Sequence, residues 1–224
     1  MLREEQAGFR RGRSCTDEIH TLRQLIEKCD SNRSIMFLNF VDFENTFDSV
    51  HRPTLWKILE VYSEPTKFIN IFKNIYDGVQ CCVKTTNGVS DWFDIKTGVR
   101  QGCVLSTLLF LIVIDFVMRK ATCKSKGIKV DASGRTLSDL DFADDVVLLG
   151  EDRENLQQTT PGVAETGKYV GLKVNKNKTN PLVLGDGGAA DILGTVICRS
   201  SGINAEITNR LRKAATVFGS MYKI

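Results

Sequence analysis

The sequence is poor in the residues that build metal sites and disulfide frameworks. Its 224 residues include two histidines and seven cysteines, and no two cysteines are spaced as CxxC. A structural zinc site needs clustered Cys and His ligands, and a disulfide framework needs an even set of paired cysteines. We therefore expect neither, and the scattered cysteines favour a reducing, intracellular location in the nucleus or the cytoplasm.

Proline is scarce, the excess of one charge sign is small, and long apolar runs are missing. The four prolines form no linker, and the hydrophobic (42%) and charged (25%) shares are those of a globular domain. The most apolar run, residues 104–118, is too short to span a bilayer, and the mixed-charge N-terminus does not resemble a signal peptide. We expect no membrane association, while the net charge of +3 leaves nucleic acid open as a partner.

Hydrophobic periodicity predicts helices and strands that mix without strict βαβ alternation, which indicates an α+β fold. Asn87-Gly88 predicts the turn of a hairpin between residues 79–86 and 89–97. Pro161 is expected to break or kink the helix that contains it, because it lacks the backbone N–H. The predicted helices are 16–29, 52–62, 64–76, 105–122, 152–169 and 205–222, and the other strands are 34–43, 136–142, 146–149, 179–184 and 192–198.

Carboxylates interrupt two segments that otherwise have the pattern of buried strands. Asp42 lies at the end of one (FVDFE), and Asp144 and Asp145 join two apolar strands in the other (DFADDVV). Two unit charges roughly 4 Å apart repel by about 4 kcal/mol at an effective dielectric constant of about 20, so a cluster of these groups needs cations. Because no histidine or thiolate is nearby, oxygen ligands favour Mg²⁺ or Mn²⁺.

The alternative is that Asp144-Asp145 is an ordinary turn and Asp42 an ordinary strand end. A turn with only a structural role is usually built from Asn-Gly or Asp-Gly, whereas this one is purely acidic. Adjacent carboxylates on a hairpin, with one more at the end of a neighbouring strand, suit two-metal phosphoryl transfer. Two basic stretches without acids, residues 119–129 and 168–178, flank the hairpin in sequence and suit a polyanionic substrate.

Five motifs in order carry a resemblance to a known family. They are QAGFR (6–10, followed by Arg13-Ser14), FVDFENTFDSV (40–50), GVRQGCVL (98–105), FADD (142–145) and GLKVNKNKT (171–179). Together they resemble the reverse-transcriptase domain of non-LTR (LINE-type) retrotransposons, in fragmentary form. The resemblance implies an RNA-directed DNA polymerase that transfers a nucleotide from a dNTP to a primer 3′-hydroxyl by a two-metal mechanism. Its partners would be an RNA template, a DNA primer and dNTPs.

The resemblance also implies a right-hand polymerase palm, an antiparallel sheet flanked by helices, with partial fingers and a truncated thumb. The expected division is partial fingers (1–35), palm with inserted finger elements (36–185), and primer-grip region with the start of the thumb (186–224). Leu193 and Gly194 match the primer grip. The endonuclease and the remaining reverse-transcriptase regions of a full-length element are expected to be absent from the 224 residues.

The resemblance assigns roles residue by residue. Asp42, Asp144 and Asp145 match the catalytic metal-binding aspartates, and the Phe43 carbonyl matches a further ligand of two Mg²⁺ or Mn²⁺ ions. Phe47 matches the aromatic gate that leaves no room for a 2′-hydroxyl on the incoming nucleotide. The alternative for Phe47 is an ordinary core position.

Other matches surround the incoming nucleotide. Gln101 and Gly102 match the loop that packs against the nucleotide and the template base. Arg10 and Arg13 resemble finger positions facing the triphosphate or the template; the alternative is a solvated face. Lys178 matches a lysine near the pyrophosphate, acting as general acid or as charge stabilisation; the alternative is a surface lysine.

Three features depart from the family pattern. Asn45-Thr46 stands where family members usually have Lys-Ala, Thr107 stands where they usually have Pro, and residues 185–188 (GDGG) replace part of a strand. Two alternatives to an active polymerase therefore stay open. One is an inactive remnant of a retroelement, and the other is a maturase-like RNA-binding accessory protein without polymerase activity.

Overall fold

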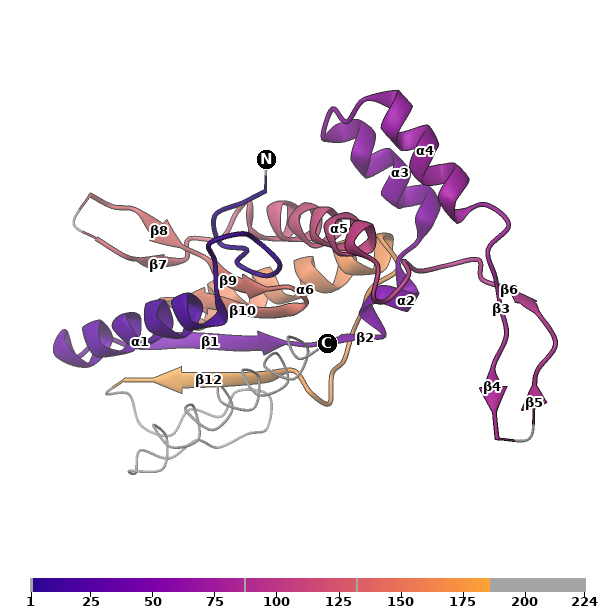
Figure 1. Ribbon diagram of the computed structural model, residues 1–224. Helices are drawn as coiled ribbons and strands as arrows, with labels where there is room; N and C mark the ends of the chain where they lie inside the picture. The colour runs from indigo at the N-terminus through magenta and orange to yellow at the C-terminus, as the bar shows by residue number, and fades with distance from the viewer. Residues whose placement is uncertain (1, 87, 132, 186–224) are drawn as a thin grey trace.

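The computed structural model describes residues 2–86, 88–131 and 133–185 (Figure 1). The predicted strand 192–198, the predicted helix 205–222 and the predicted primer grip at Leu193 and Gly194 lie outside these residues. The helices are α1 (Cys15–Ser31), α2 (Thr46–Ser49), α3 (Arg52–Val61), α4 (Thr66–Tyr76), α5 (Val104–Thr122) and α6 (Arg153–Tyr169). The strands are β1 (Met36–Val41), β2 (Phe43–Glu44), β3 (Gln80–Cys81), β4 (Lys84–Thr85), β5 (Gly88–Val89), β6 (Phe93–Asp94), β7 (Ile128–Lys129), β8 (Thr136–Leu137), β9 (Asp139–Phe142), β10 (Asp145–Gly150), β11 (Lys173–Val174) and β12 (Asn180–Leu184).

A four-stranded antiparallel sheet in the order β12-β1-β10-β9 forms the centre of the fold (Figure 1). Side chains along β1 alternate between its faces, because successive residues of a strand point to opposite sides. Met36, Leu38 and Phe40 pack in one apolar cluster with α1, whereas Phe37 and Val41 pack in another with α3, α5 and α6. Helices therefore cover both faces of the sheet.

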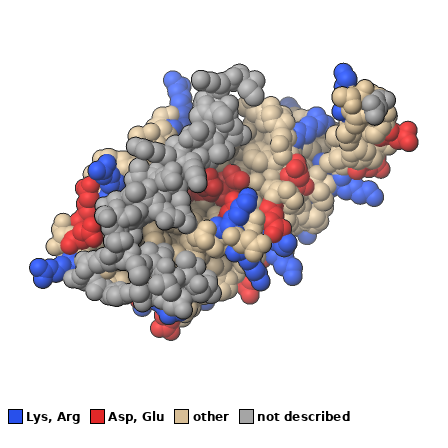
Figure 2. Space-filling view, turned by 90° about the horizontal axis from the view of Figure 1, so that it is seen from below, with Lys and Arg blue, Asp and Glu red and all other residues tan. Residues whose placement is uncertain are grey.

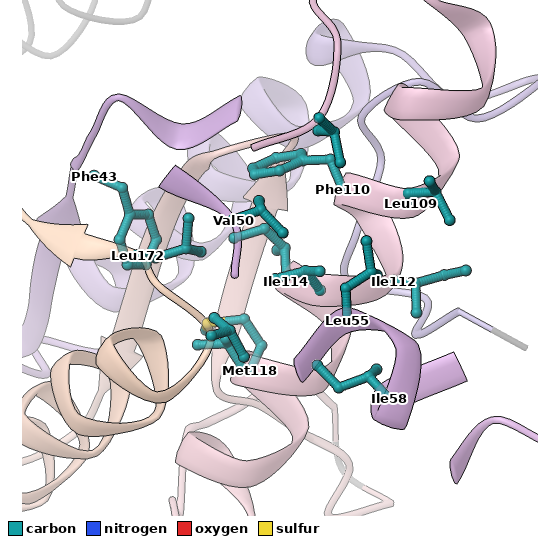
Figure 3. Packing of buried hydrophobic residues seen from close by; sticks show 14 of the residues in the cluster. Phe43, Val50, Leu55, Ile58, Leu109, Phe110, Ile112, Ile114, Met118 and Leu172 are labelled. Atoms are coloured by element: carbon teal, nitrogen blue, oxygen red, sulfur yellow. The ribbon is translucent and has the colours of Figure 1, made fainter. Parts of the chain in front are cut away.

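The larger apolar core lies between the sheet and helices α3, α5 and α6. Phe110, Ile114 and Met118 of α5 are fully buried. Figure 3 shows Leu55 of α3 beside Ile112 and Ile114 of α5. Full burial of one such side chain contributes roughly 1.5–3 kcal/mol, so α5 anchors the helical layer to the sheet.

The N-terminus of α1 shows why this segment is helical. Ser14 accepts a hydrogen bond from the Asp17 N–H, and the Asp17 carboxylate accepts one from the Ser14 N–H at 2.8 Å. Asp17 and Glu18 also place negative charge in the first turn, where the helix dipole favours it. The helix predicted over residues 16–29 is thereby confirmed as Cys15–Ser31.

Pro161 does not break its helix α6, so this part of the prediction is wrong, and a kink at this residue stays a prediction. The helix continues from Arg153 to Tyr169 with Pro161 inside it. Leu156 and Val163 on the same helix are buried in the core shared with α5 and the sheet. A proline in a helix interior costs about 3 kcal/mol, and burial of two large apolar side chains contributes a comparable amount. Tertiary packing therefore offsets the lost backbone hydrogen bond.

Two extensions leave the body of the protein in Figure 1: the pair α3–α4, and a hairpin made of β3, β4, β5 and β6. β3 pairs with β6 and β4 with β5, which confirms the predicted hairpin, while Asn87 lies outside the described residues. The buried Arg52 guanidinium donates hydrogen bonds to the carbonyls of Tyr76, Ile95 and Gly98. These bonds hold the base of the hairpin against α3.

The architecture confirms the α+β class and the antiparallel sheet flanked by helices. The boundaries of fingers, palm and thumb stay a prediction. Across residues 2–86, 88–131 and 133–185, no helix has both the length and the apolar character needed to cross a membrane.

Candidate active site

The three aspartates of the acidic segments meet at one end of the central sheet. Val41, the last residue of β1, pairs with Val146 of β10, so Asp42 follows beside Asp145. Asp144 lies in the turn that joins β9 to β10, and Asp145 begins β10. Antiparallel pairing therefore brings together carboxylates that are far apart in the sequence.

The three carboxylates influence one another electrostatically. Burial of its carboxyl group, and then the charges of Asp144 and Asp42, raise the pKa of Asp145 to about 6, an effect that Lys178 opposes. The Oδ2 atom of Asp42 is buried without a hydrogen-bond partner. The Lys178 ammonium nitrogen lies 3.6 Å from it, which makes an ion pair but not a hydrogen bond. One exposed lysine thus pairs with Asp42 and also acts on Asp145.

These features fit an oxygen-ligated divalent cation. Mg²⁺ and Mn²⁺ prefer carboxylate and carbonyl oxygens, and a bound cation relieves the repulsion between carboxylates. In the described parts of the chain, no three His, Cys, Asp or Glu side chains stand close enough together to form a closed ligand set. Cation binding would therefore draw the three carboxylates closer together.

Thr46 contacts the site, although sequence reasoning assigns it no role. Its hydroxyl donates a hydrogen bond to Oδ2 of Asp144 at 2.9 Å, and the residue is only 9% exposed. The preceding Asn45 has a left-handed backbone with φ of 47°, a conformation that Asn tolerates better than most residues. The sequence signal that could have pointed to Thr46 is that Asn45-Thr46 replaces the Lys-Ala usual in the family.

The two phenylalanines near Asp42 differ in their surroundings. Phe43 is buried, and its strand β2 pairs with β11, which fixes the backbone next to Asp42. Phe47 is half-buried and stacks on Phe110 of α5, with the ring centroids 4.6 Å apart. One side of the Phe47 ring therefore packs on the core, as the alternative interpretation expected, and its role as a sugar gate stays a prediction.

The loop before α5 carries Gln101 and Gly102. The Gln101 amide donates a hydrogen bond to the Asp48 carboxylate at 3.2 Å. Gly102 has φ of 77°, which a side chain would strain, and nothing lies within 4 Å of the position that a Cβ would take. An open groove of about 970 Å³ beside this loop is lined in part by Asp48, Arg100 and Gln101. Contact of the loop with a nucleotide stays a prediction.

Arg10 and Arg13 bind the N-terminal segment in this structure. Nη1 of Arg10 donates hydrogen bonds to the carbonyls of Arg3 and Gln6 at 2.6 and 2.8 Å. Arg13 forms an ion pair with Glu4, and 38% of its side chain is exposed. Both guanidinium groups have partners within the chain, and their contact with a triphosphate or template stays a prediction.

Sequence reasoning also missed Gln6, which joins the N-terminal segment to the acidic turn. Its side-chain amide hydrogen-bonds both the N–H and the carbonyl of Ala143, the residue before Asp144. The available signal was the QAGFR motif itself, which begins with this glutamine.

Charges of both signs meet at the site. Figure 2 shows acidic side chains near the middle of one face, with basic side chains beside them. From the basic stretch 168–178, Lys178 pairs with Asp42, and Lys173 pairs with Glu44 of β2. Part of this stretch therefore lies at the acidic cluster, and a polyanion bound there would compete with the carboxylates for these lysines.

The family model described as "Reverse transcriptase (RNA-dependent DNA polymerase)" matches residues 1–204. The chain is 28% identical over 174 residues to the Retrovirus-related Pol polyprotein from type-2 retrotransposable element R2DM of Drosophila melanogaster, covering 77% of this chain and 16% of that protein. It is 27% identical over 189 residues to the Probable RNA-directed DNA polymerase from transposon BS of the same organism, covering 81% and 20%. The chain thus spans a small part of these relatives.

Solved structures are similar in fold. Apo telomerase from Candida tropicalis, truncated from its C-terminal domain, superposes with a TM-score of 0.59 at 19% identity, covering 82% of this chain and 36% of that one. Telomerase from Candida albicans gives a TM-score of 0.56 at 16% identity, and the match covers 84% of this chain and 34% of the telomerase chain. At these identities the likeness concerns the fold, and it supports the expected right-hand polymerase architecture.

Proposed function

The chain belongs to the reverse transcriptase family, with relatives in non-LTR retrotransposons, and from this premise we propose that it is an RNA-directed DNA polymerase domain. The reaction would be attack of a primer 3′-hydroxyl on the α-phosphate of a dNTP, directed by an RNA template. The observation that carries the proposal is the convergence of Asp42, Asp144 and Asp145 from two distant segments. Burial of the Asp145 carboxyl group, and then the charges of Asp144 and Asp42, raise its pKa to about 6.

Enzymes of this family normally use divalent metal ions. In this chain, Asp42, Asp144 and Asp145, together with the Phe43 carbonyl, would hold two Mg²⁺ or Mn²⁺ ions. Such ions supply activation of the attacking hydroxyl and stabilisation of the charge on the triphosphate and leaving oxygen. The buried Oδ2 of Asp42 accepts no hydrogen bond and has the Lys178 ammonium 3.6 Å away, so it has room for a closer cation, which supports this assignment.

The remaining residues would orient the nucleotide. Phe47 would exclude a 2′-hydroxyl, and Gln101 and Gly102 would pack against the nucleotide and template base. Lys178 would leave Asp42 for the departing pyrophosphate, because its flexible side chain is 70% exposed. Arg10 or Arg13 would contact the triphosphate or the template, and Leu193 with Gly194 would contact the primer.

Primer extension tests the proposal directly. The purified chain is given a primed RNA homopolymer, dNTPs and Mg²⁺ or Mn²⁺, beside Asp144→Asn and the matched control Asp30→Asn at the exposed end of α1. Metal-dependent extension by the wild type and the control is expected. Asp144→Asn should lose at least about 10²-fold in rate, as removal of one group that stabilises developing charge typically does.

The outcomes separate the alternatives. Extension that Asp144→Asn retains would remove the acidic turn from catalysis. Salt-sensitive RNA binding without extension would instead support an RNA-binding accessory protein, and absence of both would support an inactive remnant. In an active enzyme, Phe47→Val should admit rNTPs, and unchanged sugar selectivity would remove Phe47 from the gate.

A further inference from the structure

A side chain from the N-terminal segment holds the acidic turn. Gln6 is 0% exposed, and its Oε1 atom accepts hydrogen bonds from the N–H groups of Ala143 at 2.9 Å and Gly8 at 2.7 Å. Its Nε2 atom donates a hydrogen bond to the carbonyl oxygen of Ala143 at 3.1 Å. One amide group therefore pairs both polar backbone groups of the residue that precedes Asp144.

Ala143 needs such support because of its backbone conformation. Its φ is 57°, in the left-handed region, and the residue is 1% exposed. A non-glycine residue in this region costs roughly 1–2 kcal/mol and persists only where its surroundings hold it there. Since this conformation sets the directions in which Asp144 and Asp145 leave the turn, the contacts that impose it also orient the two carboxylates.

The backbone around Gln6 fits the same turn closely. The Ala7 N–H donates to the Asp141 carbonyl at 2.8 Å, and the Asp141 N–H donates to the Glu5 carbonyl at 2.9 Å. A Cβ at Gly8 would lie 2.2 Å from the Ala143 nitrogen, so only glycine permits this approach. Residues 5–8 therefore lie along β9, and they present the Gln6 amide to the turn.

We propose that Gln6 is a positioning residue for the candidate metal site, which acts through the main chain of Ala143 to set the orientation of Asp144 and Asp145. It thereby sets the affinity of the site for a divalent cation and the rate of turnover. The part concerning turnover rests on the proposed function, whereas the part concerning cation binding does not. Gln6 itself touches neither substrate nor metal.

The chemistry of the side chain explains why a glutamine stands here. A carboxamide offers an acceptor oxygen with two lone pairs and an NH₂ donor, so one group satisfies two N–H donors and one carbonyl. An apolar side chain of similar size leaves all three buried groups unpaired. An asparagine retains the amide but is one methylene shorter, so it cannot make all three contacts in the same geometry.

Cation binding measures the effect without reference to polymerisation. Mn²⁺ is titrated into the wild type, Gln6→Leu and Gln6→Asn, and binding is monitored by electron paramagnetic resonance. The control is Gln24→Leu, at an exposed position of α1. The binding that Asp144→Asn abolishes defines the site. Loss of a group that orients a metal ligand weakens affinity by about 10–100-fold, and Gln6→Leu should fall in this range. The Mn²⁺ affinity of Gln6→Asn should lie between those of Gln6→Leu and the wild type, and the affinity of the control should equal that of the wild type.

Two further measurements exclude a merely structural role. Primer extension should show a lower kcat for Gln6→Leu with an unchanged KM for the primer–template, because the turn and not the nucleic-acid surface is altered. Hydrogen exchange should show faster exchange of the Ala143 amide in Gln6→Leu. A wild type without extension would reject the proposed function, while the Mn²⁺ titrations would still decide the role of Gln6.

A folded Gln6→Leu that binds Mn²⁺ within about twofold of the wild type would overturn the proposal, because a tenfold effect corresponds to about 1.4 kcal/mol. Thermal unfolding establishes that the variant is folded. If Gln6→Leu does not fold, Gln6→Asn carries the test. Mn²⁺ binding by Gln6→Asn weaker than that of both wild type and Gln24→Leu would then support the proposal, and binding equal to theirs would refute it.

Discussion

Two groups of carboxylates have members on β9 or in the turn that follows it, and the groups differ in where their counter-charge comes from. The first, the buried ion network, consists of Arg3 with three fully buried aspartates, Asp115, Asp139 and Asp141. The second, the candidate site, consists of Asp42, Asp144 and Asp145. The network has an arginine at its centre, whereas the candidate site has one exposed lysine 3.6 Å from one of its acids.

The contacts of Arg3 show what a carboxylate cluster needs in order to be buried. Its guanidinium pairs with Asp139 at 2.6 Å and with Asp141, and its backbone N–H donates to Asp115 at 2.7 Å. Arg119 adds an ion pair to Asp115 at 2.6 Å. Burial and the neighbouring Asp139 nevertheless raise the pKa of Asp141 well above its ordinary value.

The comparison teaches that carboxylates on neighbouring residues acquire opposite functions through their counter-charge. Where the chain supplies the cation, as in the buried ion network, the cluster ties the N-terminal segment to β9 and α5. At the candidate site the chain supplies one exposed lysine, so the three carboxylates remain able to bind cations from solution. For this physical reason we assign a structural role to the buried ion network and a chemical role to the candidate site.

Among these variants, removal of Arg3 from the buried ion network should lower the unfolding free energy the most. Arg3→Met leaves the buried carboxylates without their shared cation, and breaking a buried ion pair from one side typically costs about 3–5 kcal/mol of unfolding free energy. Urea denaturation measures the loss. The control is Arg23→Met, which removes an exposed ion pair to Glu27 and should change the unfolding free energy by less than about 0.5 kcal/mol. A loss below about 1 kcal/mol for Arg3→Met would show that the network does not carry this stability.

At the candidate site, removal of a charge should instead stabilise the protein. Asp145 has a pKa raised from 3.8 to about 6, so the fold favours its protonated form, and that contribution to stability is lost as the pH rises from about 4 to 6. Asp145→Asn should therefore be more stable than the wild type above pH 6 and equal to it below pH 4. Although the Asp145 carboxyl group is partly removed from water, the residue as a whole is exposed, so screening by solvent limits the gain to about 1 kcal/mol.

The measurement is thermal unfolding against pH in the presence of a chelator. Added Mn²⁺ should reverse the order by stabilising the wild type and not Asp145→Asn, because a ligand that binds only the folded state stabilises it. Asp30→Asn serves as the control at an exposed position. An Asp145→Asn variant that is less stable than the wild type at every pH would contradict the inference that burial and the neighbouring acids disfavour the charged form of Asp145.

An effect of comparable size is expected at Thr46, which supplies the candidate site with a hydrogen bond to Asp144. A hydrogen bond to a charged group contributes about 1.5–3 kcal/mol when buried, and less where water can replace the lost donor. Thr46→Ala restores the residue usual in the family and should change the Mn²⁺ dissociation constant by no more than about tenfold. Thr46→Ser keeps the hydroxyl and should match the wild type; equal changes in both variants would remove the hydroxyl from the explanation.

Much of the fold could be predicted from local patterns. The periodic apolar positions of α1, the apolar length of α5 and the Asn87-Gly88 turn signal each report on a few neighbouring residues, and the corresponding elements are confirmed. Pro161 shows the limit, because its local preference against helix was outweighed by burial of Leu156 and Val163. Local sequence patterns do not show which buried residues pack against each other, so they could not predict that packing would offset the proline.

The same division applies to the site. The sequence by itself determined the family, the acidic turn and the presence of Asp42 at a strand end, because five ordered motifs and the chemistry of carboxylates are legible without coordinates. Only the tertiary structure decided that Gln6 pairs with Ala143, that Thr46 reaches Asp144, and that Arg3 neutralises one acidic group and not the other. The physical reason is that hydrogen bonds and ion pairs depend on distances of a few ångströms between residues that the sequence places far apart.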